Sequence, residues 1–123
     1  MKILIIEDTD VDILIADKII KNVDSSIEVD SVESISEALI YLENTQPKPN
    51  VILLDLILPI KDGFFFLDKI KDKEHINSIP IYIYTSSIHL QDKEKATSYN
   101  NVKGYIDKPI NKKNVEEIIS KWG

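Results

Sequence analysis

Short runs of apolar residues alternate along the chain with segments in which apolar residues recur every three or four positions. Continuous runs occur at residues 3–6, 51–54 and 81–84, with weaker runs at 27–32 and 102–106. Runs that are apolar on both sides are typical of parallel strands buried between helices. Because a segment with helical periodicity follows each run, the pattern predicts an α/β fold made of five strand–helix units.

The segments between the runs carry apolar stripes at helical spacing. The predicted stripes are Val11, Leu14, Ile15 and Ile19; Ile35, Ala38, Leu39 and Leu42; Gly63, Phe66, Leu67 and Ile70; and Val115, Ile118, Ile119 and Trp122. Ser34 and Glu37 form a capping-box pattern at the start of the second helix. The segment 90–99 is charged, so we expect a helix there with little to anchor it. Together the units predict a parallel sheet with right-handed crossovers and helices on both faces.

Length and charge narrow the function classes. The 123 residues suit one compact domain, so we expect a single domain over residues 1–123 with no output domain. The formal net charge of −6 argues against binding to nucleic acid or anionic lipid, and the absence of cysteine excludes disulfides and thiol catalysis. The first apolar run stops at Glu7, too short for a signal peptide, and no later run is long enough to span a membrane. We therefore expect a cytoplasmic protein.

Polar residues follow the predicted strands at their carboxyl ends. Glu7 and Asp8 follow the first strand, Asp55 the third, Thr85 lies at the end of the fourth, and Lys108 follows the fifth. Ligand sites in open parallel sheets lie beyond these ends. If the strand order is 2-1-3-4-5, the first and third strands are neighbours, roughly 4.8 Å apart, which places three carboxylates in one cleft. Oxygen ligands of this kind predict a site for a hard cation such as Mg²⁺.

Asp55 is the strongest candidate for chemistry. It stands between two apolar segments, where an unpaired carboxylate costs several kcal/mol of desolvation. A carboxylate fixed beside Mg²⁺ can attack phosphorus and form an aspartyl phosphate, and Lys108 and Thr85 are placed to neutralise and hydrogen-bond the phosphoryl oxygens. Taken alone, Glu7 and Asp8 are equally consistent with an acidic first turn that favours the dipole of the next helix.

These segments resemble the receiver domains of two-component response regulators, especially the stand-alone kind related to the chemotaxis regulator. The resemblance covers essentially the whole chain and implies a flavodoxin-like, doubly wound five-stranded parallel sheet in the order 2-1-3-4-5 with helices on both faces. It rests on IIED at residues 5–8, LLDLILPIKDG at 53–63, YTSS at 84–87 and KGYIDKPI at 103–110. Each motif is weak alone, but all four in this order and spacing are specific.

The resemblance implies a phosphoacceptor and a metal site. Asp55 would be the phosphoacceptor, Glu7 and Asp8 the Mg²⁺-binding acidic pair, and the backbone carbonyl of Ile57 a further metal ligand. The pair is Glu-Asp here, whereas many members of the family have Asp-Asp. A haloacid dehalogenase site is excluded because it needs an acid two residues after its nucleophile, where this chain has Ile57.

The resemblance also implies a switch. Lys108 would contact the phosphoryl group, Thr85 would be the switch hydroxyl, and Tyr105 the switch aromatic. The Lys108–Pro109 bond resembles the cis peptide of the family, which proline makes accessible at about 0.5–1 kcal/mol. The surface expected to change lies around the predicted helix 90–99, the strand 102–106 and the last helix.

The implied function is that of a phosphoacceptor in a two-component phosphorelay. A sensor histidine kinase or a histidine phosphotransfer protein would supply the phosphoryl group to Asp55, and the output would be the binding of another protein by a monomer or weak dimer. The domain would catalyse its own phosphorylation and dephosphorylation without turning over an external substrate. The alternative is a pseudo-receiver, an interaction module that keeps the fold without being phosphorylated.

Overall fold

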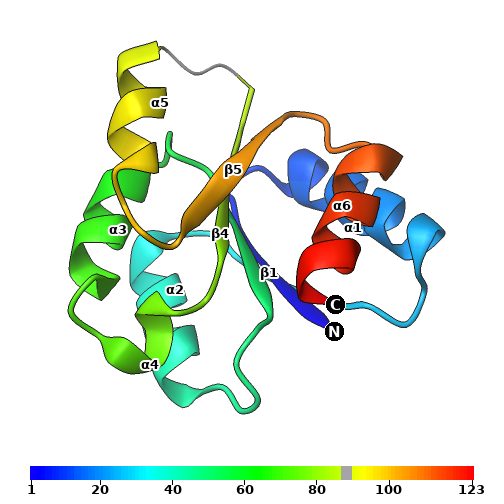
Figure 1. Cartoon of the computed structure of the whole chain (residues 1–123), viewed down its shortest axis with the longest axis horizontal. Helices are drawn as coiled ribbons and strands as arrows, with labels where there is room; N and C mark the ends of the chain where they lie inside the picture. Colours follow the sequence, from blue (N-terminus) through cyan, green and yellow to red (C-terminus); the bar gives the residue numbers. More distant parts are fainter. Residues whose placement is uncertain (87–89) are drawn as a thin grey trace.

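Five parallel strands form one sheet in the order β2-β1-β3-β4-β5, as the sequence predicts (Figure 1). The computed structural model describes residues 1–86 and 90–123. The strands are β1 (Lys2–Ile6), β2 (Glu28–Val32), β3 (Val51–Leu54), β4 (Ile81–Thr85) and β5 (Val102–Asp107). The helices are α1 (Asp10–Val23), α2 (Ile35–Asn44), α3 (Gly63–Ile70), α4 (Glu74–Asn77), α5 (Leu90–Thr97) and α6 (Lys112–Trp122). The predicted doubly wound fold is confirmed.

The helices cover the sheet on both faces (Figure 1). Helices α1 and α6 lie on one face, and α2, α3, α4 and α5 lie on the other. Side chains alternate along each central strand, so Leu4 and Ile6 of β1 join one core while Ile3 and Ile5 join the other. All four are fully buried, and burial of each such side chain contributes about 1.5–3 kcal/mol. The sheet is therefore a rigid platform whose carboxyl edge carries the loops.

Side-chain caps fix where two of these helices begin. Asp62 begins α3 by accepting the backbone N–H of Phe65 at 3.0 Å. Ser34 begins α2 in the same way, accepting the N–H of Glu37 at 3.1 Å. The carboxylate of Glu37 reaches the N–H of Glu33 at 2.8 Å rather than that of Ser34, so only half of the predicted capping box forms. A cap of this type contributes about 1 kcal/mol.

The predicted buried face of α1 was wrong. The structure buries Ala16 and Ile20, whereas Val11 and Leu14 are 63% and 66% exposed and Ile19 is half-buried. Helix α1 is apolar around most of its circumference, so helical spacing alone is consistent with more than one buried face. Ala16 and Ile20, which are four positions apart, pack onto the sheet. Val11, Leu14 and Ile15 form an apolar strip of α1 that is left exposed.

Helix α5 is lightly anchored, as its composition predicts, because Ala96 alone is buried among residues 91–97, the part of the helix whose side chains the structure describes. It ends at Thr97, and Tyr99 follows it and donates a hydrogen bond from its hydroxyl to Asp68 of α3. A second link comes from β5, where the hydroxyl of Tyr105 donates to the backbone carbonyl of Lys93. The short helix α4 was not predicted. Among the described residues, no helix is both long enough and apolar enough to cross a membrane.

Candidate functional site

An acidic cluster lies at the carboxyl edge of the sheet, where β1 and β3 end side by side. The pairing of Ile6 with Leu54 places Glu7 next to Asp55. Single carboxylate oxygens of Glu7, Asp8 and Asp55 all lie within 4.8 Å of one another. Glu7 is fully buried and Asp55 is 5% exposed, whereas Asp8 is open to solvent. The structure thus brings together the three carboxylates that the sequence predicts.

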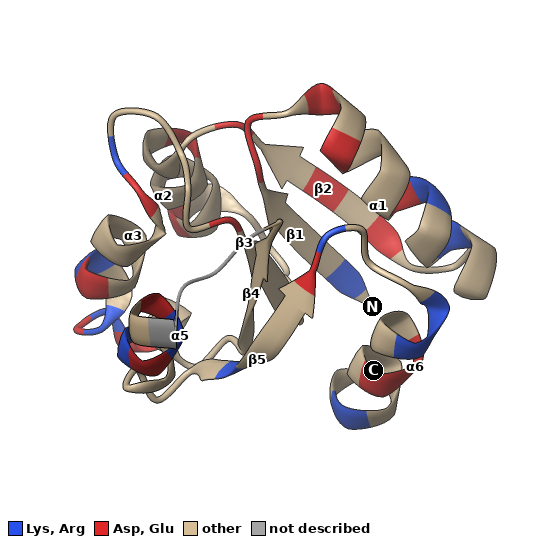
Figure 2. Cartoon of the chain, turned by 90° about the horizontal axis from the view of Figure 1, so that it is seen from above, with Lys and Arg blue, Asp and Glu red and all other residues tan. Residues whose placement is uncertain are grey.

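Lys108 brings a positive charge into this cluster from the loop after β5, on the far side of β4. In Figure 2, a blue segment follows the arrowhead of β5 at the same edge of the sheet. Its backbone N–H donates to the carbonyl of Thr85 at 3.1 Å, and the peptide bond to Pro109 is cis, as predicted. Its ammonium Nζ lies 2.9 Å from Asp55 Oδ2 and also donates to Glu7 Oε2. The side chain therefore spans one intervening strand to reach the predicted phosphoacceptor.

Burial and charge shift the ionisation of this cluster. Burial is the largest influence on Glu7 and raises the pKa of its carboxyl, and neighbouring Asp55 raises it further, against the opposing effect of Lys108. Burial alone would lower the pKa of Lys108, but its hydrogen bonds to Glu7 and Asp55 outweigh that effect and the pKa is raised. Lys108 therefore carries its positive charge at neutral pH, and this one ammonium contacts the carboxyl groups of both Glu7 and Asp55.

The donor set fits a hard divalent cation. Carboxylate oxygens from separate loops converge, and one member, Asp8, is exposed, which leaves room for the water ligands that Mg²⁺ retains. Hydrogen bonds hold two of the carboxylates in place. Thr9 N–H donates to Glu7 Oε1 at 3.0 Å, and Ile57 N–H donates to Asp55 Oδ1 at 2.9 Å. The role of the Ile57 carbonyl as a ligand stays a prediction.

Asp12 was missed by the sequence reading. Its carboxylate Oδ2 lies 3.2 Å from Lys108 Nζ, so the ammonium contacts Glu7, Asp12 and Asp55 together. The available signal was helical spacing, because Asp12, Ala16 and Ile20 are four positions apart and so lie on one side of α1. The prediction of the wrong buried face for α1 hid this signal.

The two predicted switch residues lie beside the cluster rather than in it. Thr85 is buried at the carboxyl end of β4, next to the loop that carries Lys108. Tyr105 is half-buried on β5 and bonds the backbone of α5 at Lys93. Ser87, the last residue of the YTSS motif, lies outside the described residues.

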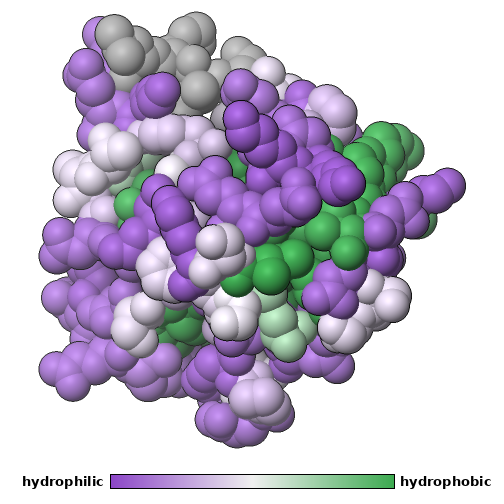
Figure 3. Space-filling view, turned by 45° about the vertical axis from the view of Figure 1, so that its right-hand side comes forward, coloured by the Kyte–Doolittle hydropathy of each residue, from purple (hydrophilic) through white to green (hydrophobic). Residues whose placement is uncertain are grey.

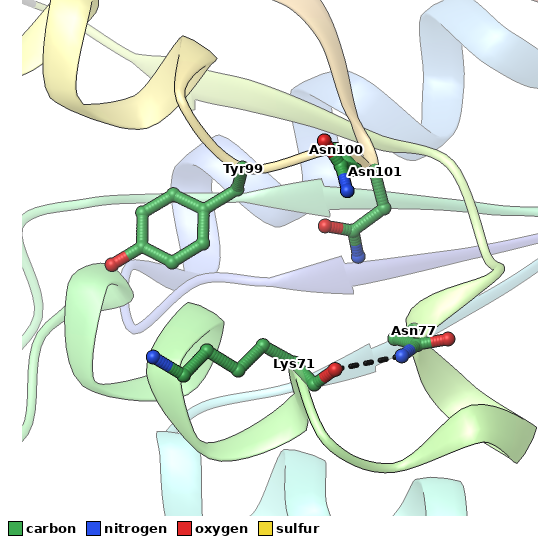
Figure 4. A pocket seen from close by; sticks show the side chains of 5 residues that line it. All are labelled: Lys71, Asn77, Tyr99, Asn100 and Asn101. Carbon is green, nitrogen blue, oxygen red and sulfur yellow. Dashed lines mark hydrogen bonds between the residues drawn. The ribbon is translucent and has the colours of Figure 1, made fainter.

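A separate cavity of about 180 Å³ lies at the opposite edge of the sheet (Figure 4). Lys71 and Asn77 line it from the segment before β4, and Tyr99, Asn100 and Asn101 line it from the turn before β5. The side chain of Asn77 donates to the carbonyl of Lys71 at 2.7 Å. Because these residues precede the strands and the acidic cluster follows them, the cavity is no part of the acidic site.

Comparison with known proteins gives one consistent family. A family model described as the response regulator receiver domain matches residues 3–120. The response regulator Rcp1 of Synechocystis sp. is 30% identical over 95% of this chain and 82% of its own. Hybrid signal transduction histidine kinases D and L of Dictyostelium discoideum are 33% and 32% identical over 68% and 99% of the chain. The chain spans only 6% and 7% of the length of these two kinases.

Solved structures give the same result. The phosphorylated cyanobacterial phytochrome response regulator RcpA superposes with a TM-score of 0.83 at 32% identity, covering 98% of this chain and 92% of its own. The Mn²⁺-bound form of response regulator Rcp1 gives 0.76 at 29% identity, covering 98% and 93%. The fold, the sequence matches and the acidic cluster agree, and the chain belongs to the response regulator receiver domain family of two-component signalling.

Proposed function

We propose that Asp55 accepts a phosphoryl group in an Mg²⁺-dependent reaction, from the phosphohistidine of a sensor histidine kinase or a histidine phosphotransfer protein. The observation that carries the proposal is the position of Asp55, buried at a strand end with Oδ2 2.9 Å from the Lys108 ammonium. The acidic cluster around it supports a divalent cation, and a relative of this chain is known in an Mn²⁺-bound form.

The chemistry follows from the donors around Asp55. A carboxylate oxygen of Asp55 forms a bond to phosphorus while the P–N bond of the donor breaks and its electron pair stays on the imidazole nitrogen. The N–H of Ile57 holds Oδ1 at 2.9 Å, and the Lys108 ammonium neutralises charge on the transferring group. Bound Mg²⁺ would supply further neutralisation, held by Glu7, Asp8 and Asp55. Attack of water on the phosphorus of the acyl phosphate releases inorganic phosphate and returns Asp55 to a carboxylate.

The signal would leave the site through β4 and β5. A phosphoryl group on Asp55 adds charge and acceptor oxygens, which would draw the hydroxyl of Thr85 toward them. Thr85 lies at the end of β4, and the neighbouring β5 carries Tyr105, whose hydroxyl holds α5 at Lys93. Phosphorylation would therefore bias the position of the lightly anchored α5 and change the surface that α5, β5 and α6 present to a downstream protein.

The exposed strip of α1 supports a protein as phosphodonor. Figure 3 shows an apolar patch on the side of the molecule that carries α1 and α6. Val11, Leu14 and Ile15 of α1 are 63%, 66% and 38% exposed. The same helix contacts Lys108 through Asp12, so one helix carries both the apolar strip and a contact to the acidic cluster. A phosphohistidine protein that packed its apolar surface on this strip would bring its imidazole to the edge where Asp55 lies.

The test is the mass of the intact protein after incubation with acetyl phosphate and Mg²⁺. We expect one added phosphoryl group on the wild type, none on Asp55→Asn, and no addition when Mg²⁺ is removed by a chelator. Asp62→Asn is the matched control, because it makes the same change in the same loop and asparagine can also cap α3. A wild type that takes no phosphoryl group from acetyl phosphate or from a phosphohistidine protein would be a pseudo-receiver and would overturn the proposal.

A further inference from the structure

Asp12 holds a position that the proposed reaction does not use. The Lys108 ammonium has three N–H donors, and each has a carboxylate within reach, on Glu7, Asp12 and Asp55. Glu7 and Asp55 also belong to the cluster that would hold the cation, whereas Asp12 does not. Asp12 is therefore the partner that Lys108 keeps when a divalent cation engages the other two.

We propose that Asp12 is a positioning residue that restrains Lys108 and limits how strongly the ammonium engages a phosphoryl group on Asp55. This inference rests on the proposed phosphorylation of Asp55. Asp12 lies 3.2 Å from Lys108 Nζ and its side chain is 33% exposed, against 0% for Glu7 and 6% for Asp55. This partial exposure makes the ion pair weaker than the two buried ones, so the restraint that Asp12 places on Lys108 is modest.

The direction of the effect follows from charge. A phosphoryl group carries negative charge, and a carboxylate on the same ammonium competes with it for N–H donors and repels it. Removing the charge of Asp12 while keeping an acceptor oxygen, as asparagine does, leaves Lys108 freer to bind the phosphoryl oxygens. An ion pair of this partial exposure corresponds to a rate effect of about 3- to 10-fold.

The packing of α1 fixes Asp12 in this place. Asp12, Ala16 and Ile20 are spaced by four residues, so they lie on one side of the helix. Ala16 and Ile20 are fully buried against the sheet, which directs Asp12 toward the carboxyl edge. The contact with Lys108 is therefore built into the docking of the helix and does not depend on a mobile side chain at the surface.

The test compares Asp12→Asn with Asp12→Glu and a control, Asp17→Asn, which makes the same charge change further along α1. At saturating Mg²⁺ we expect Asp12→Asn to raise the initial rate of phosphorylation by acetyl phosphate about 3- to 10-fold. Asp12→Glu should return the rate close to that of the wild type, and Asp17→Asn should leave it within about 2-fold. An unchanged or lower rate in Asp12→Asn would overturn the proposal, as would an equal rise in Asp17→Asn.

A second measurement keeps this test separate from the test of Asp55. The side-chain ammonium signal of Lys108 in a ¹⁵N-labelled protein reports the contact without any phosphorylation. We expect it to shift in Asp12→Asn and to stay in place in Asp17→Asn. If the wild type accepts no phosphoryl group, the proposed function fails whatever this signal does. If the signal is unchanged in Asp12→Asn, the role of Asp12 fails whatever happens at Asp55.

Discussion

Replacement of Lys108 by methionine tests whether the acidic cluster depends on a single buried cation. Methionine keeps the apolar volume of the side chain but removes the ammonium, which leaves Glu7 and Asp55 buried side by side without a counter-charge. Removal of one partner from a buried ion pair costs about 3–5 kcal/mol. Glu7 can avoid this cost by binding a proton. Protonation of a carboxyl with an ordinary pKa of 4.5 costs about 3.4 kcal/mol at neutral pH, so the contribution of Glu7 to the loss of stability cannot exceed that value.

We therefore expect Lys108→Met to lower the free energy of unfolding by about 3 kcal/mol at neutral pH, or roughly 12 °C in the midpoint for a chain of this length. The pKa of Glu7 is already raised by burial, and it rises further without Lys108. A carboxyl with a raised pKa in the folded state destabilises the fold above that pKa, and the effect disappears as the pH falls below the ordinary pKa. The deficit should therefore shrink in acid.

Urea unfolding is the assay, with the fluorescence of Trp122 as its probe. The indole of Trp122 is half-buried and donates to the hydroxyl of Tyr82 at 3.0 Å, so it reports the loss of the packed core. The double variant Glu7→Gln with Lys108→Met should recover much of the lost stability, because glutamine carries no charge to bury. A loss below about 1 kcal/mol, or a loss of equal size in acid and at neutral pH, would refute this reasoning.

Three further predictions concern the start of α3, the α1 strip and the turn after α5. Gly63→Ala should cost about 1–3 kcal/mol in urea unfolding, because its Cβ would lie 2.8 Å from Leu56 Cδ2 and 2.9 Å from the backbone of Leu56. Leu14→Ser should slow transfer from a phosphohistidine protein about 3-fold or more while leaving the rate with acetyl phosphate unchanged. Burial and the hydrogen bond to Asp68 raise the pKa of Tyr99 to about 12. The free energy of unfolding should therefore fall as the pH rises from 10 toward 12, and this fall should be smaller in Tyr99→Phe.

The buried parallel strands were predictable from the apolar runs, whereas the strand order came with the resemblance to receiver domains. Residues 3–6 and 51–54 are short runs that are apolar on both sides, which is typical of strands buried between two layers of helices, and the structure buries all of them. The convergence of Glu7, Asp8 and Asp55 then followed from the neighbouring positions of β1 and β3. This part of the candidate site depends on topology: hydrophobic patterning predicts the strands, and the strand order makes β1 and β3 neighbours.

The rotation of α1 was not predictable in the same way. Its apolar residues surround most of the helix, so periodicity could not separate the face carrying Ala16 and Ile20 from the strip carrying Leu14. The packing of α1 against the sheet and α6 decides between them, and that is a tertiary effect. The contact of Asp12 with Lys108 depends on this rotation, which is why it was found only in the structure.

The most direct measurement is the position of the phosphoryl group in the chain. The wild type treated with acetyl phosphate and Mg²⁺ would be digested and its peptides analysed by tandem mass spectrometry, with hydroxylamine treatment to cleave acyl phosphates. The account predicts a hydroxylamine-sensitive phosphoryl group on the peptide that contains Asp55, and none elsewhere. A hydroxylamine-resistant group on a hydroxyl such as that of Thr85, or a modification that survives Asp55→Asn, would contradict it.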